Sequence, residues 1–341
     1  MKKYRLGKTN LFVSEIGFGG IPISRVSHEK AIKTIRRAID LGINFIDTAN
    51  GYVDSEEKIG MAIKNVYKRE DLIIATKSTR RTKKELLDHI HNSLKLLQTD
   101  YIDLFQIHQV SKDDDIIRVF KEDGAYDTVL EAQKNGKIRH IGITSHRLEA
   151  AIQLVKTNKF ETIQFPGNFV ECNSFEMLFP EAQKRDIGCI IMKPLGGGEL
   201  NNARLCFRYL QQYPEYIPIP GISEIEEIEE IVNLYENKEP ITQEDLDKIE
   251  IIKKEVGHNF CRRCAYCEPC PADVKIFAAM AIPRLMRNYG NKYSAEWFLE
   301  GIKSVDKCVR CGLCEQRCPY SLPIRDTIQK NKEFYNKTIN K

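Results

Sequence analysis

The sequence lacks any uncharged apolar run of the roughly 18 residues that a membrane-spanning helix needs, and its first residues, MKKYRLGKTN, hold no apolar signal core. It also lacks a strong charge of either sign, because 52 Lys and Arg stand against 48 Asp and Glu, spread evenly over 341 residues. Such a balance is typical of a solvated surface and argues against a nucleic-acid partner. We therefore expect a cytoplasmic protein with no nucleic-acid or membrane partner.

Low-complexity tracts are missing as well, and we find no internal repeat beyond an alternation of short strands with helices. Hydrophobic residues make up 42% of the chain and charged residues 29%, so a packed core can form. The length fits a barrel of about 250 residues followed by a small second domain.

Short apolar runs alternate with helical patterns up to residue 235 or so. The clearest helical patterns are His28–Leu41, Glu56–Tyr67 and Lys83–Leu97, with apolar spacings of three and four. Eight strand–helix units predict a closed (β/α)8 TIM barrel, and Tyr4–Val13 predicts a hairpin across its bottom. The predicted strands are Ile16–Gly19, Asn44–Asp47, Leu72–Thr76, Ile102–Ile107, Ile138–Ile143, Thr162–Phe165, Cys189–Met192 and Ile217–Ile219.

A linker is expected at Glu236–Pro240, followed by a helix from Thr242 to about Glu255. We divide the chain into a barrel, residues 1–255, and a C-terminal domain, residues 256–341. In that domain Val274–Ile302 has a helical pattern, and Pro283 and Gly290 predict breaks in it.

Cysteine is used unevenly. Of eleven cysteines, Cys172, Cys189 and Cys206 are scattered, and the other eight form two groups near the C-terminus. Grouped cysteines without a secretion signal indicate metal binding rather than disulfides.

The second group, CVRCGLCEQRCP from Cys308, has the C-x2-C-x2-C-x3-C-P spacing of bacterial ferredoxins, in which the fourth cysteine ligates the other cluster. The first group, CRRCAYCEPCP from Cys261, is one residue shorter. A four-cysteine zinc site is the alternative, but zinc needs pairs rather than two quartets. We predict an α-helical ferredoxin-like domain with two [4Fe–4S] clusters, which suggests an anaerobe or a well-reduced cytoplasm. One cluster is assigned to Cys261, Cys264, Cys267 and Cys318, and the other to Cys308, Cys311, Cys314 and Cys270.

Four polar residues lie at or just after predicted strand ends, where a barrel carries its chemistry. Asp47 and Tyr52 lie in NFIDTANGY, Lys77 ends IATK, and His108 ends FQIH. Over most of the predicted barrel the sequence resembles the aldo-keto reductases, matching their D-T-A-x-x-Y, S-E, T-K and I-H motifs. It resembles in particular the subfamily with a C-terminal ferredoxin-like domain. The resemblance implies a nicotinamide-dependent oxidoreductase with a small carbonyl or alcohol substrate.

The four residues suit carbonyl reduction. Tyr52 is the candidate proton donor, although a free phenol, with a pKa of about 10, is too weak alone. A positive charge on Lys77 would lower that pKa, and Asp47 would hold Lys77. His108 would orient the carbonyl by donating a hydrogen bond.

The resemblance also implies nucleotide contacts. Gln164, Asn168 and the pair Thr144 and Ser145 match positions that hold the nicotinamide end. Met192 replaces an aromatic residue that stacks on nicotinamide in many relatives. The loop that follows offers Pro194, Leu195 and Gly196, and glycines through Gly198 would let a phosphate approach backbone N–H groups.

After the eighth strand come Gly221, Ser223 and Glu227, where NADP-using relatives place Lys and Arg around the 2′-phosphate. Glutamates here predict NAD(H) over NADP(H). The alternative is a helix start, with Ser223 and Glu226 as a capping box.

Three functions remain open. The first is carbonyl reduction, or the reverse oxidation, coupled to iron–sulfur electron transfer, with a ferredoxin or flavoprotein as a possible electron partner. The second is an electron-transfer protein with a non-catalytic barrel, and the third is a reductase with structural clusters. Nicotinamide passes two electrons as hydride while each cluster takes one, and no flavin motif is visible in the chain.

Overall fold

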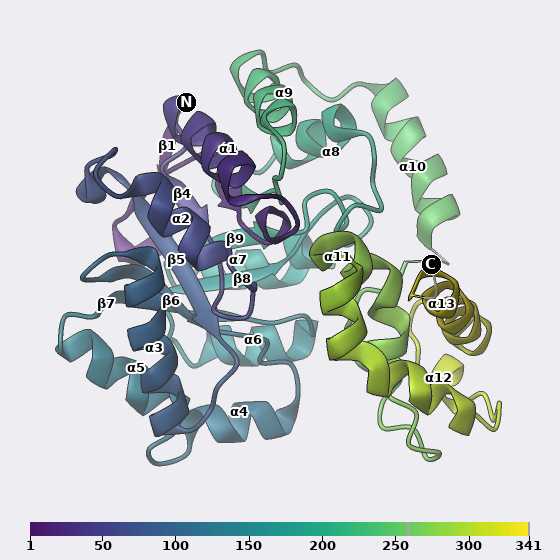
Figure 1. Cartoon of the computed structure of the whole chain (residues 1–341). Helices are drawn as coiled ribbons and strands as arrows, with labels where there is room; N and C mark the ends of the chain where they lie inside the picture. The colour runs from purple at the N-terminus through teal and green to yellow at the C-terminus, as the bar shows by residue number, and fades with distance from the viewer. Residues whose placement is uncertain (258–259, 340–341) are drawn as a thin grey trace. The chain divides into compact units, whose positions relative to one another are not determined.

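The computed structural model describes residues 1–257 and 260–339. The chain forms two compact units, Met1–Ile241 and Thr242–Lys341 (Figure 1). Helix α10 (Gln243–Gly257) belongs to the second unit by compactness, whereas the sequence analysis groups most of it with the barrel. Its start matches the expected cap, since Thr242 Oγ1 accepts from Asp245 N (3.2 Å) and Asp245 Oδ2 accepts from Thr242 N (3.1 Å).

The first unit is the predicted barrel. Its strands all fall on predicted segments and pair in parallel in chain order. Strands β3 and β10 meet through hydrogen bonds from Gly17 N to Pro218 O (2.9 Å) and Gly19 N to Pro220 O (2.8 Å). Glycine is needed at position 19 because a Cβ there would lie 2.6 Å from Pro220 O. The strands are β3 (Phe18–Gly19), β4 (Phe45–Asp47), β5 (Ile73–Ser78), β6 (Ile102–Ile107), β7 (Ile138–Thr144), β8 (Thr162–Pro166), β9 (Gly188–Met192) and β10 (Ile217–Ile219).

Helices follow the strands, as the barrel prediction requires. In the first of them Ala31, Ile35 and Ala38 are buried at helical spacing, and Ser27 Oγ accepts from Lys30 N (3.3 Å) as the N-cap. The helices of this unit are α1 (His28–Asp40), α2 (Ser55–Ile63), α3 (Lys83–Leu97), α4 (Asp113–Phe120), α5 (Ala125–Lys134), α6 (Leu148–Lys156), α7 (Phe179–Gln183), α8 (Ala203–Leu210) and α9 (Ile225–Glu236).

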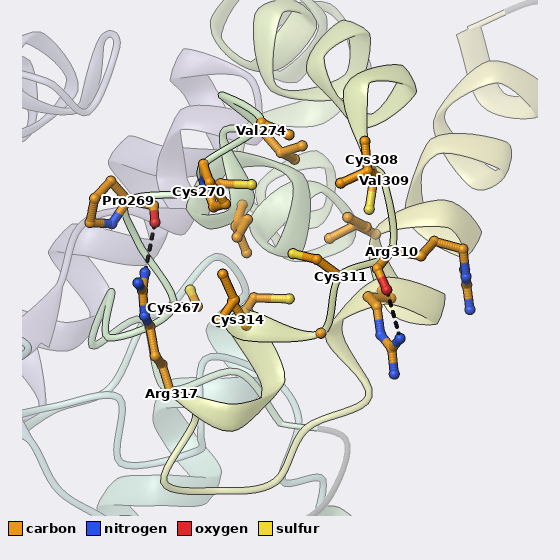
Figure 2. Close-up of a pocket in the computed structure, with 17 residues that line it drawn as sticks. Cys267, Pro269, Cys270, Val274, Cys308, Val309, Arg310, Cys311, Cys314 and Arg317 are labelled. Atoms are coloured by element: carbon orange, nitrogen blue, oxygen red, sulfur yellow. Dashed lines mark hydrogen bonds between the residues drawn. The ribbon is translucent and has the colours of Figure 1, made fainter.

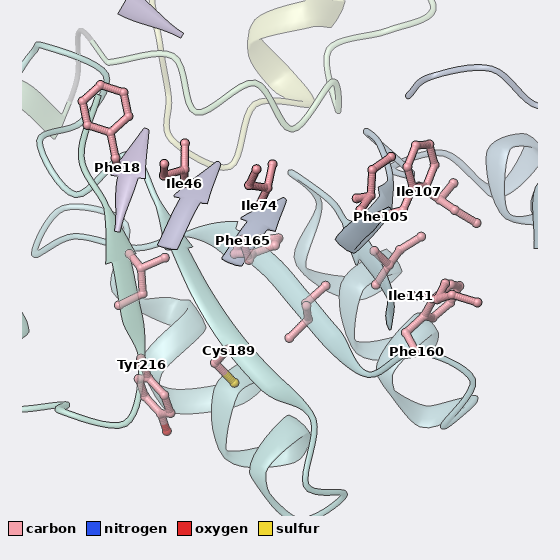
Figure 3. Close-up of a cluster of buried hydrophobic side chains, with 14 of the residues drawn as sticks. Phe18, Ile46, Ile74, Phe105, Ile107, Ile141, Phe160, Phe165, Cys189 and Tyr216 are labelled. Atoms are coloured by element: carbon pink, nitrogen blue, oxygen red, sulfur yellow. The ribbon is translucent and has the colours of Figure 1, made fainter. Parts of the chain in front are cut away.

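Because successive side chains of a strand point to opposite faces, the barrel has two apolar cores, one outside the sheet and one inside it. Ile46, Ile74 and Phe105 face outward and pack in the layer under the helices (Figure 3). Phe45 and Leu104, each one residue earlier in its strand, belong to the separate core that fills the barrel. The alternate residues whose side chains point into the barrel therefore continue to the carboxyl ends of the strands, where the candidate catalytic residues lie.

The predicted N-terminal hairpin is confirmed. Strands β1 (Lys3–Arg5) and β2 (Phe12–Ser14) pair antiparallel, with Tyr4 opposite Val13. Leu6 and Val13 are buried in the same core as Phe45 and Ile217, which begin their strands. The hairpin thus closes the barrel at the amino ends of the strands, away from the candidate site.

The second unit is helical, as predicted, and its described residues contain no strand. It consists of α10, α11 (Ile276–Ser304), α12 (Leu313–Gln316) and α13 (Ile324–Ile339). The breaks predicted at Pro283 and Gly290 are wrong, since α11 runs through both positions. Pro283 cannot donate to Ala279 O, and Asn331 Nδ2 of the last helix donates to that carbonyl instead (2.9 Å). Within the described residues, no helix is long and apolar enough to cross a membrane.

Candidate functional site

The four predicted catalytic residues come together at the carboxyl end of the barrel. Lys77 Nζ donates to Asp47 Oδ2 (2.6 Å) and to Thr48 O (2.7 Å), and it lies 5.0 Å from the centre of the Tyr52 ring. The ring centres of Tyr52 and His108 are 6.1 Å apart, with the planes at 79°. A cation and an imidazole therefore both lie close to the half-buried phenol.

Strand geometry explains this convergence. Asp47 is the last residue of β4, and Lys77 lies near the end of β5, in phase with the inward-facing Phe45 and Ala75. His108 directly follows β6. The loop carrying Tyr52 is tightly wound, because Val53 has a φ of 54°, an uncommon conformation for a β-branched residue. Such local strain often marks functional loops.

Burial controls the charges of the central pair. Asp47 and Lys77 are 2% and 1% exposed. Desolvation raises the pKa of the Asp47 carboxyl, and the positive charge of Lys77 opposes that rise. Desolvation lowers the pKa of the Lys77 ammonium, and Asp47 opposes that fall. Each group thus depends on the other to remain charged.

Sequence reasoning missed two polar residues beside this pair. Gln106 Nε2 donates to Asp47 Oδ1 (3.1 Å), and the Glu56 carboxylate accepts from Thr76 Oγ1 (2.6 Å). Gln106 was detectable, because it lies two residues before His108 on the inward phase of β6. Glu56 is the glutamate of the S-E motif quoted in the sequence analysis, but no role was assigned to it, because a glutamate in the first turn of a helix usually faces solvent.

The predicted contacts for the nicotinamide end lie around the same strand ends. Gln164 in β8 is 2% exposed, and its Oε1 has no hydrogen-bond partner within the part of the chain that the structure describes. Thr144 ends β7 and accepts from Gln109 N (2.8 Å), and Ser145 follows, fully buried. Met192 ends β9 and is half-buried.

Asn168 is engaged by the protein itself. Its Oδ1 accepts from Val170 N and Glu171 N (both 2.9 Å), and its Nδ2 donates to Lys193 O (3.1 Å). The side chain therefore joins the loops after β8 and β9. A hydrogen bond to a nucleotide would have to compete with these bonds.

In the glycine-containing loop after β9, backbone N–H groups donate to carbonyl oxygens of the loop itself. Gly196, Gly197 and Gly198 all have positive φ, and Pro194 and Leu195 lead into them. The N–H groups of Gly196 and Gly198 donate to Lys193 O and Leu195 O (both 2.9 Å). For these two donors, the expected approach of a phosphate is not supported, because the turn already occupies them.

Around Ser223 the structure corrects the predicted capping box by one residue. Helix α9 begins at Ile225, so Glu224 is the N-cap, and its partner is Glu227 rather than Glu226. Glu227 Oε2 accepts from Ser223 N (2.7 Å) and Glu224 N (3.1 Å). The Glu227 carboxylate is thus held against the helix start, a position that offsets its charge.

An arginine that the sequence analysis did not single out lies next to this turn. Arg25, in the segment after β3, donates from Nη2 to Ser223 Oγ (2.7 Å). Gly221 forms the bridge to Gly19 that helps close the barrel, and a Cβ at position 221 would lie 2.8 Å from Pro22 Cγ. This turn therefore carries a guanidinium as well as glutamates.

The second unit contains two cysteine-lined cavities. In the first, Cys270 of the first cysteine group joins Cys308, Cys311 and Cys314 of the second group (Figure 2). The second cavity is lined by Cys261, Cys264, Cys267 and Cys318, and Cys267 lines both. Apart from the sharing of Cys267, these sets match the two predicted quartets, including the exchange of the fourth cysteine.

The thiols suit a metal cluster that brings its own positive charge. All eleven cysteines are free. Burial, with Cys261 and Cys318 nearby, raises the pKa of the Cys264 thiol to about 11, and a bound metal would favour its thiolate form. Among the described residues, no three ligand side chains gather closely enough to hold one metal ion. A cubane spreads its four thiolates over several iron atoms and does not need such a group.

The two cysteine loops have the same backbone course. Arg263 and Ala265 have φ of 64° and 63°, and Arg310 and Gly312, at the equivalent positions, have φ of 54° and 80°. Alternating left-handed residues turn N–H groups toward one side and form anion-binding concavities. A thiolate-ligated cluster is such an anion.

The two cysteine loops also make equivalent contacts with the helices that follow them, α11 and α13. Glu268 accepts from Phe277 N (3.0 Å) in the first turn of α11, and Glu315 accepts from Arg325 N (2.9 Å) in the first turn of α13. Each glutamate directly follows the third cysteine of its group. The expectation of no further internal repeat is therefore wrong, because loop and helix occur twice. The one-residue insertion and the few shared side chains hid the repeat in the sequence.

Comparison with known proteins agrees with both units. Residues 15–205 match the aldo/keto reductase family, and residues 260–323 match a 4Fe-4S dicluster domain. The aldo-keto reductase YhdN of Bacillus subtilis is 33% identical over 217 residues, covering 59% of this chain and 64% of that protein. L-galactose dehydrogenase of Arabidopsis thaliana is 29% identical over 220 residues, covering 57% and 66%.

Solved structures show the same barrel. The holo form of aldo-keto reductase AKR11C1 from Bacillus halodurans has a TM-score of 0.64 and 26% identity, covering 74% of this chain and 96% of that one. An aldo-keto reductase from Klebsiella pneumoniae, solved with NADPH, has a TM-score of 0.63 at 21% identity, covering 74% and 95%. From its barrel, its motif residues and its paired cysteine loops, the chain belongs to the aldo/keto reductase family and carries a 4Fe-4S dicluster domain near its C-terminus.

Proposed function

We propose that the chain catalyses nicotinamide-dependent reduction of a small carbonyl compound, or the reverse oxidation of an alcohol. The observation that carries this proposal is the Lys77 ammonium, buried against Asp47 and 5.0 Å from the centre of the Tyr52 ring. A cation at this place favours the phenolate form of Tyr52 and so makes the phenol a better acid.

Each residue then has a chemical task. When bound, nicotinamide supplies or accepts hydride. The carbonyl oxygen gains negative charge during reduction, and Tyr52 gives its phenolic proton to that oxygen. His108, whose ring centre lies 6.1 Å from that of Tyr52, donates a hydrogen bond to the same oxygen and orients it. Asp47 keeps Lys77 in position and charged.

The site offers an acceptor for a nicotinamide amide. Gln164 Oε1 is buried and has no hydrogen-bond partner among the described residues, and burying such an atom unpaired costs about 1–3 kcal/mol. A carboxamide NH2 group would satisfy it. An interaction with the Gln164 side chain also lowers the pKa of Asp47, which supports a position of this amide near the catalytic pair.

The test uses anaerobically purified full-length protein, with methylglyoxal as substrate and NADPH or NADH as donor. The matched relatives include the methylglyoxal reductases DkgA and DkgB, which motivates this substrate. Tyr52→Phe should lower kcat/KM by roughly a hundredfold or more while nucleotide binding stays nearly unchanged. Tyr126→Phe, whose hydroxyl donates to Lys159 O, is the control and should behave as wild type. Wild-type rates in Tyr52→Phe would refute the mechanism.

We further propose that the two cysteine quartets each hold a [4Fe–4S] cluster and that these exchange electrons with the barrel reaction. The clusters would supply one-electron transfer, with a ferredoxin or flavoprotein as partner. Anaerobic addition of NADPH or methylglyoxal should then change the visible absorption and the electron paramagnetic resonance of the clusters. If dithionite reduces the clusters and neither reactant does, they are structural.

The preference for NAD(H) over NADP(H) stays a prediction, and fewer residues support it than the sequence analysis indicated. Glu227 is engaged in capping α9, and Arg25 lies beside Ser223. The Klebsiella pneumoniae neighbour was solved with NADPH. The supporting feature that remains is the excess of glutamate in the first turns of α9.

A further inference from the structure

Glu56 is a buried carboxylate that has no role in the mechanism proposed for Asp47, Tyr52, Lys77 and His108. It occupies the second position of α2, four residues after Tyr52, and is only 2% exposed. Its neighbour Glu57 is about half-exposed, as a glutamate in a first helical turn normally is. Burying an ionisable carboxyl costs several kcal/mol unless partners compensate, so Glu56 requires an explanation beyond helix capping.

The hydrogen-bond partners of Glu56 lie in the segments that carry Tyr52 and Lys77. Oε1 accepts from Thr76 Oγ1 (2.6 Å), directly before Lys77 on β5. Oε2 lies 3.5 Å from Asn50 Nδ2 in the loop that leads to Tyr52, and Asn50 N donates to Lys77 O (3.0 Å). Glu56 therefore joins the loop of the proton donor to the strand of the cation.

The charge of Glu56 also acts on Lys77. Burial raises the pKa of Glu56, and polar side chains from α3, β5 and the β4–α2 loop oppose that rise, namely Ser93, Thr76 and Asn50. Lys77 is the one charged group among the opposing influences. In return Glu56 adds to Asp47 in opposing the fall of the Lys77 pKa. The ammonium thus lies in the field of two carboxylates.

We propose that Glu56 is a positioning residue of the reductase site, which keeps Lys77 charged and holds the Tyr52 loop against β5. This inference rests on the proposed function, in which Lys77 makes Tyr52 acidic. Loss of the negative charge at position 56 would let Lys77 lose its proton at lower pH. Tyr52 would then ionise at higher pH, because the cation beside it is gone.

The test follows the ionisation of Tyr52 without any turnover. The full-length protein is labelled with 13C at the tyrosine ring carbon that bears oxygen, and the Tyr52 signal is assigned by its loss in Tyr52→Phe. In Glu56→Gln, which is nearly isosteric, Tyr52 should ionise roughly one pH unit higher than in wild type. Glu57→Gln removes the same charge one residue away in solvent and should leave the titration unchanged.

Glu56→Asp separates charge from shape. It keeps the carboxylate and loses a methylene, so the titration of Tyr52 should return toward wild type. A purely structural role predicts the reverse order, with Glu56→Asp more disturbed than Glu56→Gln. That order, or equal titrations in Glu56→Gln and Glu57→Gln, would overturn the proposal. Absence of carbonyl reduction in wild type would instead count against the proposed function and leave this titration interpretable.

Discussion

At the scale of single residues, the barrel site depends on a buried ion pair whose members each compensate the other's desolvation. Asp47 and Lys77 are almost fully buried, and their 2.6 Å contact is the main compensation for burying two charges. Stability and catalysis are therefore tied to the same two side chains.

Lys77→Met should abolish carbonyl reduction and also destabilise the protein by about 3–5 kcal/mol, because it leaves the Asp47 carboxylate buried without its cation. Urea unfolding followed by circular dichroism measures the loss. Adding Asp47→Asn to Lys77→Met should recover most of the stability and none of the activity. If the single and double variants are equally unstable, the pair is not the source of the effect.

Glu227→Arg should shift nucleotide preference toward NADP(H), by roughly tenfold or more in the ratio of dissociation constants, since a cation would then face a 2′-phosphate. It should also weaken the start of α9, because Ser223 N and Glu224 N lose their acceptor. Fluorescence titration with NADPH and NADH measures the first effect. Tighter wild-type binding of NADPH than NADH would refute the predicted NAD(H) preference.

At the scale of elements, the duplicated cysteine loops differ informatively at one position. Gly312 and Ala265 occupy the same left-handed site, with φ of 80° and 63°. A Cβ at Gly312 would meet nothing closer than the Arg325 guanidinium at 3.8 Å, so the cost of adding it is conformational rather than steric. The first loop already bears that cost at Ala265.

Ala265→Gly should therefore stabilise its loop and Gly312→Ala should destabilise the other, each by about 1 kcal/mol. The readout is the temperature at which the iron–sulfur absorbance of anaerobic protein is lost. Opposite shifts in the two variants are expected. Parallel shifts would show that the two loops are not conformational equivalents.

At the scale of the whole molecule, the chain joins an aldo/keto reductase barrel to a helical domain built from two loop-and-helix copies. Equivalent residues of the copies, Val274 with Leu322 and Ile276 with Ile324, share one apolar core. The cysteines exchange between copies in the same way, so neither loop can complete a cavity without the other.

Anaerobically purified protein should contain about eight iron and eight acid-labile sulfide per chain. Cys314→Ala should lose mainly one cluster, because Cys314 lines only the cavity that also contains Cys308 and Cys311. Cys172→Ala should keep full iron content, since Cys172 lines neither. Stoichiometric zinc without sulfide would contradict the assignment and return the quartets to structural metal sites.

The sequence by itself determined the features that depend on local periodicity and spacing. Strand alternation located Asp47, Lys77 and His108 at the carboxyl end of the barrel, and cysteine spacing separated the two quartets. Side-chain partners from distant segments were decided only by the tertiary structure. Closing the barrel brings Arg25 to Ser223 and Thr76 to Glu56, and the start of α9 turns Glu227 into its cap. Alternation indicates which face a residue occupies, but the partner it meets depends on how separate elements pack together.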